Sequence, residues 1–261
     1  MIYVTGDAHC DFRRFTESQI EKLPFELTKR DKVIICGDFG LLWAKDRMFE
    51  YNLKMLSSLP FKILWVQGNH ENYDMTAEYR LEKWKGGKVR HIVRDKIILL
   101  ERGQVFKIEG KSFFTFGGAS SHDIQGGVLD RNASSYIADR EKAIQSGLPY
   151  RVKHFSWWEQ ELPTEEELQE GLRNLERVNF QVDYVISHCA SNRTQDAVEL
   201  HYSSGGFGGK LYEQDILTNY FDVLEDRLHF KKWYFGHYHD NFDVDEKHTL
   251  IYEYIVPLSG V

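Results

Sequence analysis

Residues 63–71 read ILWVQGNHE, and the organisation of the chain can be worked out from this stretch. Its first four residues are apolar, which predicts a short buried strand. The strand ends at Gly68 and is followed by an amide, an imidazole and a carboxylate on Asn69, His70 and Glu71. In open α/β sheets ligands bind just beyond the carboxyl ends of strands, so the arrangement is typical of a functional site. Taken alone, a Gly-Asn turn followed by two exposed polar residues explains it equally well.

The same pattern, an apolar run followed by residues that can bind a metal, occurs four more times. The runs begin at residues 2, 33, 182 and 233, and they are followed by Asp7 and His9, by Asp38, by His188, and by His237 and His239. Each of these residues on its own is more often a turn or core residue than a ligand. The i, i+2 spacing puts Asp7 and His9 on the same side of an extended chain, where both can reach one cation. His237 and His239 share this spacing, and they either bind one cation or reach two neighbouring ones.

The first three runs each lead into a loop and a helix, which predicts parallel βαβ units. Beyond residue 79, short strand candidates look antiparallel and predict a second sheet, at residues 89–93, 97–100, 104–108 and 112–116. Helices are predicted at residues 11–23, 47–58 and 211–226, and after Thr164, which is an N-cap followed by acidic residues. Residues 241–244 and 249–256 predict a terminal hairpin. The Gly- and Ser-rich residues 203–209 predict a mobile loop that borders the site, or a plain connector.

Residues 119–163 form the least regular part of the chain and are predicted to be an insertion or cap on one domain that spans residues 1–261. The segment contains several arginines, among them Arg131, Arg140 and Arg151, and the pair Trp157 and Trp158. Arginine suits phosphate and aromatic rings suit a base, so Arg131, Arg140 and Trp157 are the predicted substrate contacts. The alternative is that the tryptophans pack the segment onto the core, which we favour for at least one of them.

The composition restricts the class of protein. The chain has 261 residues, 42% of them apolar, and a formal charge of -7, so broad attraction to nucleic acid is not expected. Bound cations would reverse that field locally, which keeps phosphate substrates open. No apolar run is long enough to span a membrane, and the first residues lack a signal-peptide layout. The three cysteines do not form a disulfide framework, so a cytoplasmic protein is expected.

The candidate ligands together predict a metal site, and they offer only oxygen and nitrogen atoms: Asp7, His9, Asp38, Asn69, His188, His237 and His239. Without thiolates, soft-metal chemistry is not indicated. Seven ligands are too many for one tetrahedral zinc ion, but they suit two cations that share a bridging carboxylate. Two such ions can hold a phosphoryl group and a bridging hydroxide. His70 is then left over as an imidazole that can stabilise developing charge and protonate the leaving oxygen.

The ordered motifs Asp-x-His, Gly-Asp, Gly-Asn-His-Glu, His and Gly-His-x-His resemble the calcineurin-like metallophosphoesterase superfamily, in particular its small bacterial and phage-type members. The resemblance runs from Asp7 to His239 and implies a four-layer α/β-β/α sandwich of two mixed sheets. It implies that one metal is bound by Asp7, His9, Asp38 and His239, and the other by Asp38, Asn69, His188 and His237, with Asp38 bridging. It further implies that His70 is the catalytic histidine and that the metals are two divalent or mixed-valence ions, with manganese first and iron, zinc, nickel or cobalt as the other candidates.

One motif departs from the protein serine/threonine phosphatase branch of that superfamily. Residues 37–43 read GDFGLLW and lack the aspartate and arginine that this branch carries there, so protein-phosphatase activity is not expected. Another group must orient His70, and Glu71 and Asp74 are the nearest carboxylates in the sequence. We therefore predict a dinuclear metal-dependent phosphoesterase that favours phosphodiesters or nucleotides, with nucleic-acid ends among its candidate substrates. The competing hypothesis is a non-catalytic metal-binding scaffold or interaction subunit on the same fold.

Overall fold

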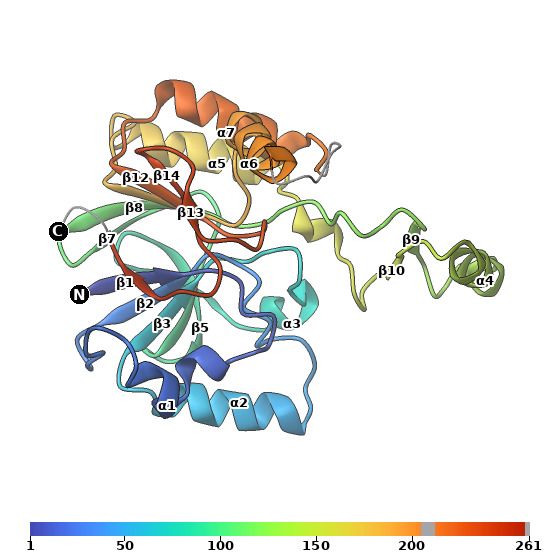
Figure 1. Cartoon of the computed structure of the whole chain (residues 1–261), viewed down its shortest axis with the longest axis horizontal. Coiled ribbons are helices and arrows are strands. Elements are labelled where there is room, and N and C mark those ends of the chain that lie inside the picture. Colours follow the sequence, from blue (N-terminus) through green and yellow to red (C-terminus); the bar gives the residue numbers. More distant parts are fainter. Residues whose placement is uncertain (205–211, 259–261) are drawn as a thin grey trace.

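The computed structural model describes residues 1–204 and 212–258. Two mixed β-sheets face each other, and helices cover the outer face of each sheet (Figure 1). The four layers follow the order helix, sheet, sheet, helix, which confirms the predicted α/β-β/α sandwich. Within the described ranges, no helix is both long and apolar enough to cross a membrane.

The first sheet has seven strands: β1 (Ile2–Thr5), β2 (Lys32–Ile35), β3 (Lys62–Trp65), β4 (Leu81–Trp84), β5 (Gly87–Val93), β6 (Ile97–Leu100) and β15 (Val256–Pro257). Their order is β15-β1-β2-β3-β6-β5-β4. Strands β1, β2 and β3 run parallel, as the βαβ pattern predicts, and β6, for which an antiparallel arrangement is predicted, also pairs in parallel with β3. Every residue of β1, β2 and β6 is buried, because parallel strands in such a sheet are covered on both faces.

The second sheet has six strands: β7 (Gln104–Ile108), β8 (Lys111–Phe116), β11 (Tyr184–Ser187), β12 (Lys232–Phe235), β13 (Phe242–Asp243) and β14 (His248–Leu250). Their order is β13-β14-β12-β11-β8-β7. The prediction that all strands between residues 89 and 116 belong to this sheet is wrong for the first two. β6 pairs in parallel with β3 and keeps β5 in the first sheet, so the second sheet begins at β7. The predicted terminal hairpin is confirmed as the antiparallel pair β13 and β14, but its second strand is shorter than the predicted 249–256, because β14 ends at Leu250 and Val256 belongs to β15 in the first sheet.

The helices form the outer layers. α1 (Glu17–Ile20) and α2 (Arg47–Ser58) cover the first sheet, and α5 (Glu165–Glu176), α6 (Asn192–Ser204) and α7 (Ile216–Arg227) cover the second (Figure 1). The short helix α3 (Tyr73–Ala77) follows β3. The predicted cap of α5 is confirmed, because the Thr164 side chain accepts the Glu167 N–H and Glu167 accepts the Thr164 N–H.

Two helix predictions need correction. Residues 11–23 form a 3-10 turn at Arg13–Phe15 and the single turn α1, separated by extended backbone at Thr16. Arg14 gives a reason for the break, because its guanidinium donates to the carbonyls of Gly6, Asp7 and Tyr252 and ties this segment to the loop after β1.

The second correction concerns the helix predicted at 211–226. This helix, α7, begins later, after Asp215, whose carboxylate caps the N–H groups of Leu217 and Thr218. The Gly- and Ser-rich stretch predicted at 203–209 lies outside the described residues, except for its first two residues, which end α6.

The segment 119–163 is more regular than predicted and projects away from the two sheets (Figure 1). It contains β9 (Val128–Leu129), β10 (Arg151–Val152), the 3-10 turn Glu159–Glu161 and an 11-residue helix, α4 (Tyr136–Ser146). Ala143 is the only buried residue of α4, and its apolar residues Ile137 and Ile144 are 71% and 54% exposed. The helix therefore buries no apolar face against the core.

Three clusters of buried side chains hold the layers together. One lies between the first sheet and its helices, one between the second sheet and its helices, and the third fills the space between the sheets. The third is built from side chains such as Ile34, Leu64, Phe113 and Ile186, which come from both sheets. This packing fixes the sheets against each other, so the loops that leave β1, β2 and β3 meet the loops that leave β11 and β12 at one edge.

Candidate metal centre

The structure brings the seven predicted ligands together at this edge. Asp7 and His9 follow β1, Asp38 follows β2 and Asn69 follows β3, whereas His188 follows β11, and His237 and His239 follow β12. The first sheet thus supplies four of them and the second sheet three. Neither sheet alone carries the complete set, because the centre lies where the two sheets meet.

One group of ligand atoms is formed by Asp7, His9 and His239. His239 Nε2 lies 3.2 Å from Asp7 Oδ2 and 2.9 Å from His9 Nε2, and His9 Nε2 lies 3.6 Å from the same carboxylate oxygen. His9 and His239 are partly open to solvent, with 27% and 45% of their side chains exposed, whereas the Asp7 side chain is fully buried. Three donors within 4.8 Å of one another on the open side are suited to one cation.

A second group lies deeper, around Asp38 and His188. His188 Nε2 is 3.4 Å from Asp38 Oδ2 and 3.1 Å from Asn69 Oδ1. The same Asp38 oxygen lies 3.7 Å from His9 Nε2 in the first group. One carboxylate oxygen therefore stands between the two groups. The His237 ring packs against the His188 ring with 5.0 Å between centroids, on the buried side.

The protonation of His188 follows from its neighbours. Its Nδ1 lies 2.8 Å from the carbonyl oxygen of Cys36. A carbonyl only accepts hydrogen bonds, so Nδ1 carries a proton, and Nε2 is the ring nitrogen that faces Asp38 and Asn69. A backbone carbonyl that holds one ring nitrogen of a histidine in this way is the usual support for a metal-binding imidazole.

The backbone at this edge is strained. Four of the seven predicted ligands have positive φ without being glycine: His9 at 46°, Asp38 at 47°, His237 at 70° and His239 at 54°. Such residues cluster at functional sites because the fold must hold them there. The extended chain predicted for Asp7 and His9 is therefore wrong, and a tight turn brings the two side chains together. His237 and His239, in contrast, point to different places: His237 towards His188 and His239 towards Asp7. This arrangement matches the alternative in which the two histidines reach two neighbouring cations.

Two glycines are required because the chains approach so closely. A Cβ added to Gly68 would lie 2.1 Å from Asp38 Oδ1, and one added to Gly236 would lie 2.1 Å from Asp7 Oδ1. The close approach lets backbone N–H groups orient both carboxylates. The His70 N–H donates to Asp38 at 2.7 Å, and the His237 N–H lies 3.1 Å from both oxygens of Asp7.

The charges at the centre call for cations. Asp7 and Asp38 are each 1% exposed, and neither forms an ion pair with Lys or Arg in residues 1–204 and 212–258. Burial raises the pKa of each carboxyl group, but the neighbouring histidines, with His188 first among them, together outweigh it, so both pKa values are lowered. Burial lowers the pKa of His188, but Asp38 and Asp7 outweigh it and raise this pKa to about 9. Buried carboxylates are paired or bind metals, so this donor set fits divalent metal ions.

His70 is held by an arginine from the projecting segment. The Arg151 Nη2 lies 2.7 Å from His70 Nε2, and its guanidinium donates to both carboxylate oxygens of Asp123, at 2.6 and 2.9 Å, and to the Ser156 carbonyl at 2.9 Å. The Arg151 side chain is only 5% exposed. Arg151 is not among the predicted site residues, because no spacing in the sequence connects residue 151 with residue 70.

The two carboxylates that the sequence offered for orienting His70 are used elsewhere. Glu71 is buried and accepts the Phe39 N–H at 2.8 Å, which fixes the turn after β2, and burial raises its pKa to about 8. Asp74 accepts the Trp158 indole N–H at 2.7 Å and lies 2.9 Å from His154 Nδ1. The expectation that one of them contacts His70 is not met.

The predicted substrate contacts belong to the projecting segment. Arg131 and Arg140 are exposed on the projecting part, where Arg131 stacks over the Phe155 ring at 4.1 Å and Arg140 belongs to α4 (Figure 1). Trp157 is partly buried beside β10. Trp158 is fully buried and packs edge-to-face on Trp43 at 5.8 Å, which confirms for one tryptophan that it fastens the segment to the core.

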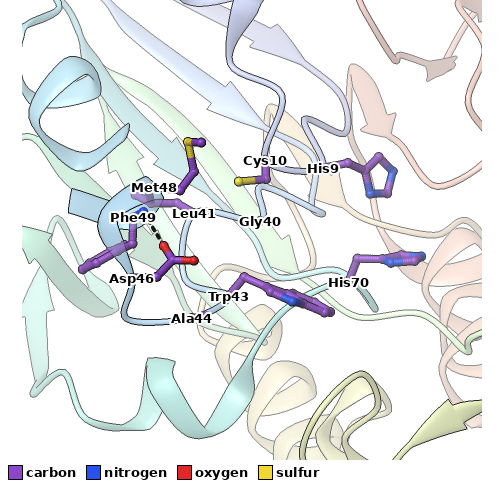
Figure 2. Close-up of a pocket in the computed structure, with 10 residues that line it drawn as sticks. All are labelled: His9, Cys10, Gly40, Leu41, Trp43, Ala44, Asp46, Met48, Phe49 and His70. Atoms are coloured by element: carbon purple, nitrogen blue, oxygen red, sulfur yellow. Dashed lines mark hydrogen bonds between the residues drawn. The ribbon is translucent and has the colours of Figure 1, made fainter. Parts of the chain in front are cut away.

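Two cavities flank the centre. One, of about 280 Å³, opens beside His9 and His70 and is shown in Figure 2. The other, of about 390 Å³, lies beside His237 and is lined mainly by polar side chains such as His122, Gln195, Tyr212 and Asp215. The centre thus has space for a ligand on both sides.

A cluster of carboxylates and imidazoles at the loop edge of two facing α/β sheets defines a metal-dependent hydrolase. The family model for calcineurin-like phosphoesterases matches residues 1–241, and the chain belongs to this family. The resemblance seen in the sequence is thereby confirmed, and the chain is a metallophosphoesterase, an enzyme of metal-dependent phosphoester hydrolysis.

Solved structures are also similar to this chain. The crystal structure of phosphopantetheinyl hydrolase from Mycobacterium tuberculosis is similar to this chain, with 14% identity and a TM-score of 0.45. The similarity covers 97% of this chain and 89% of that one. No curated protein sequence matches the chain.

Proposed function

We propose that this enzyme uses two metal ions to hydrolyse phosphodiesters, with nucleotides as the favoured substrates. The observation that carries the dinuclear proposal is Asp38 Oδ2, which stands between His9 Nε2 at 3.7 Å and His188 Nε2 at 3.4 Å. We assign one metal to Asp7, His9, Asp38 and His239, and the other to Asp38, Asn69, His188 and His237. Manganese is the first candidate, followed by iron, zinc, nickel and cobalt. When bound, the two ions supply a hydroxide nucleophile and neutralise the charge that develops on the phosphoryl oxygens.

In this proposal His70 protonates the leaving oxygen. Its ring lies 4.9 Å from the His9 ring, beside the assigned ligands, and it faces the smaller cavity. Arg151 is a positioning residue, because its guanidinium joins His70 to Asp123 and limits the rotation of the imidazole. In this proposal residues 1–261 form one domain. The segment 119–163 is a cap within it that brings Arg151 to the centre.

The preference for diesters is supported by the two cavities. A phosphodiester carries a substituent on each side of the phosphorus, and the cavities beside His70 and beside His237 give each of them a place. A monoester would use only one cavity. This preference is the finer part of the proposal and is tested separately below.

The experiment compares bis-p-nitrophenyl phosphate with p-nitrophenyl phosphate, using protein stripped of metal and then supplied with manganese. Metal content is measured in the same samples. We expect two manganese ions per chain and metal-dependent hydrolysis that is faster for the diester. Faster hydrolysis of the monoester would refute the diester preference, and one metal per chain at full activity would refute the dinuclear centre. Two bound metals with no hydrolysis of either ester would favour the scaffold hypothesis.

A further inference from the structure

The smaller cavity is continuous with the metal centre and has one distinctive wall. Its residues come from the turn after β1, the loop after β2 and the start of α2, and they join the centre through His9 and His70 (Figure 2). Ligand atoms of His9, Asp38 and His70 lie within 4.8 Å of one another. A substituent on a phosphorus atom bound at the centre could therefore extend directly into this pocket.

The wall opposite the centre is apolar and aromatic. Trp43 lies between Asp46 and His70 in Figure 2, and Leu41, Met48 and Phe49 complete this side. The Trp43 ring is held by its edge-to-face contact with Trp158. The backbone carbonyl of Trp43 accepts the Asn72 side-chain N–H at 2.8 Å. Met48 is nevertheless 58% exposed. A fixed indole and an exposed thioether beside a reaction centre are typical of a surface that packs against a ligand.

The charge of the pocket restricts what it can hold. None of its ten lining residues, all of which the structure describes, is Lys or Arg. The nearby Lys45 is paired with Glu78, and Arg151, which contacts the lining residue His70, is paired with Asp123. Asp46 caps α2 by accepting the Phe49 N–H at 2.8 Å with Oδ1, and its other oxygen points towards the middle of the pocket (Figure 2). A free carboxylate oxygen favours hydrogen-bond donors and repels anions. The pocket therefore suits an uncharged ring better than a further phosphate.

We propose that this pocket is the leaving-group subsite, and that it selects alcohols that carry a flat, uncharged aromatic ring of nucleobase size. The inference rests on the proposed function, because His70 marks the side on which the leaving oxygen must lie. In the reaction one water adds to phosphorus, and the bond from phosphorus to the leaving oxygen breaks with its electron pair. The leaving oxygen takes a proton from His70, and His70 regains a proton from the attacking water. The alcohol leaves through the pocket, and a phosphomonoester remains.

The experiment uses three methyl phosphodiesters whose second substituent is benzyl, cyclohexylmethyl or 4-carboxybenzyl. Cyclohexylmethanol is somewhat less acidic than the benzyl alcohols, so the contribution of the pocket is the part of the kcat/KM ratio that is lost in Trp43→Ala. With the manganese-loaded full chain we expect the benzyl ester to exceed the cyclohexylmethyl ester about fivefold, because rings stack on Trp43. We expect the 4-carboxybenzyl ester to be the slowest, because its charge faces Asp46.

Two variants test the assignment of residues. Trp43→Ala should lower the ratio of kcat/KM for the benzyl ester to that for the cyclohexylmethyl ester. Asp46→Asn should raise the ratio of kcat/KM for the 4-carboxybenzyl ester to that for the benzyl ester about two- to fivefold, and the fold should be kept because Asn caps a helix as well as Asp does. Tyr51→Ala and Glu50→Gln are the matched controls, since both side chains are exposed on α2 outside the pocket and should change neither ratio.

A binding measurement separates this inference from the proposed function. Saturation-transfer NMR with the three free alcohols reports contact without hydrolysis. Preferential binding of benzyl alcohol that is lost in Trp43→Ala supports the subsite, even if no ester is hydrolysed and the proposed function fails. Equal hydrolysis of the three esters would overturn the subsite while leaving the phosphodiesterase intact. Equal binding of the three alcohols, with or without hydrolysis, would also overturn it.

Discussion

Replacement of Arg151 by Ala tests how the cap segment contributes to catalysis. The change removes a guanidinium that is 5% exposed and that contacts His70 at 2.7 Å and both oxygens of Asp123. A catalytic group misplaced by about 1 Å loses about 10²-fold in rate, which corresponds to about 2.7 kcal/mol. We therefore expect kcat to fall by this factor while metal content stays at the wild-type value.

The effect on stability should be much smaller than the effect on kcat. Asp123 is 40% exposed, so its ion pair with Arg151 is worth about 1 kcal/mol and Tm should fall by only a few degrees. Added guanidinium ion should restore part of kcat, whereas Arg151→Lys should not, because a single ammonium cannot reach both partners. Hydrolysis of bis-p-nitrophenyl phosphate, metal analysis and thermal unfolding make up the assay.

The matched control for this prediction is Lys153→Ala. Lys153 forms a surface ion pair with Glu159 in the same segment, and its removal should change neither kcat nor Tm measurably. A kcat of Arg151→Ala within about twofold of wild type would refute the positioning role. A fall in kcat that guanidinium does not rescue, together with a large fall in Tm, would show that Arg151 acts only through the fold.

Three further predictions follow from particular contacts. His70→Ala should keep its metals, measured by elemental analysis, yet lower kcat by about 10²–10⁴-fold; unchanged kcat would remove His70 from the mechanism. Gly68→Ala should lose metal and about 10²-fold in kcat/KM, because the added Cβ would lie 2.1 Å from Asp38 Oδ1; full metal content and activity would show that the loop can yield. Burial raises the pKa of Asp183, but Lys231 and Ser112 outweigh it and lower this pKa to about 2. The ionised Asp183 carboxylate therefore stabilises the fold above the usual carboxyl pKa, and this stabilisation is lost as the pH falls towards 2. Asp183→Ala should therefore lower the free energy of unfolding by about 1 kcal/mol at pH 7, measured with urea, with the difference shrinking below pH 4; a constant difference would contradict this origin.

The sequence alone was enough for the part of the fold that depends on local burial. Strands β1, β2, β3, β11 and β12 are almost completely buried, so each appears as a continuous apolar run. The candidate ligands stand directly after those runs, and this is why they could be named from their spacing. Where few residues are buried the sequence carries only a weak signal, as in α4, whose residues Ile137 and Ile144 are exposed.

Tertiary structure decided the contacts between residues that are distant in the chain. The sheet to which β5 and β6 belong depends on the pairing of β6 with β3, and the partner of His70 lies 81 residues away in Arg151. Asp38 Oδ2 stands between His9 and His188. Strained turns place His9 and Asp38, and the opposite sheet supplies His188. A local pattern records which residues are buried and where a strand ends, and it therefore determined the kinds of ligand. The distances between them arise only when the two sheets pack, because that packing fixes which loops meet and which side chain fills the remaining space.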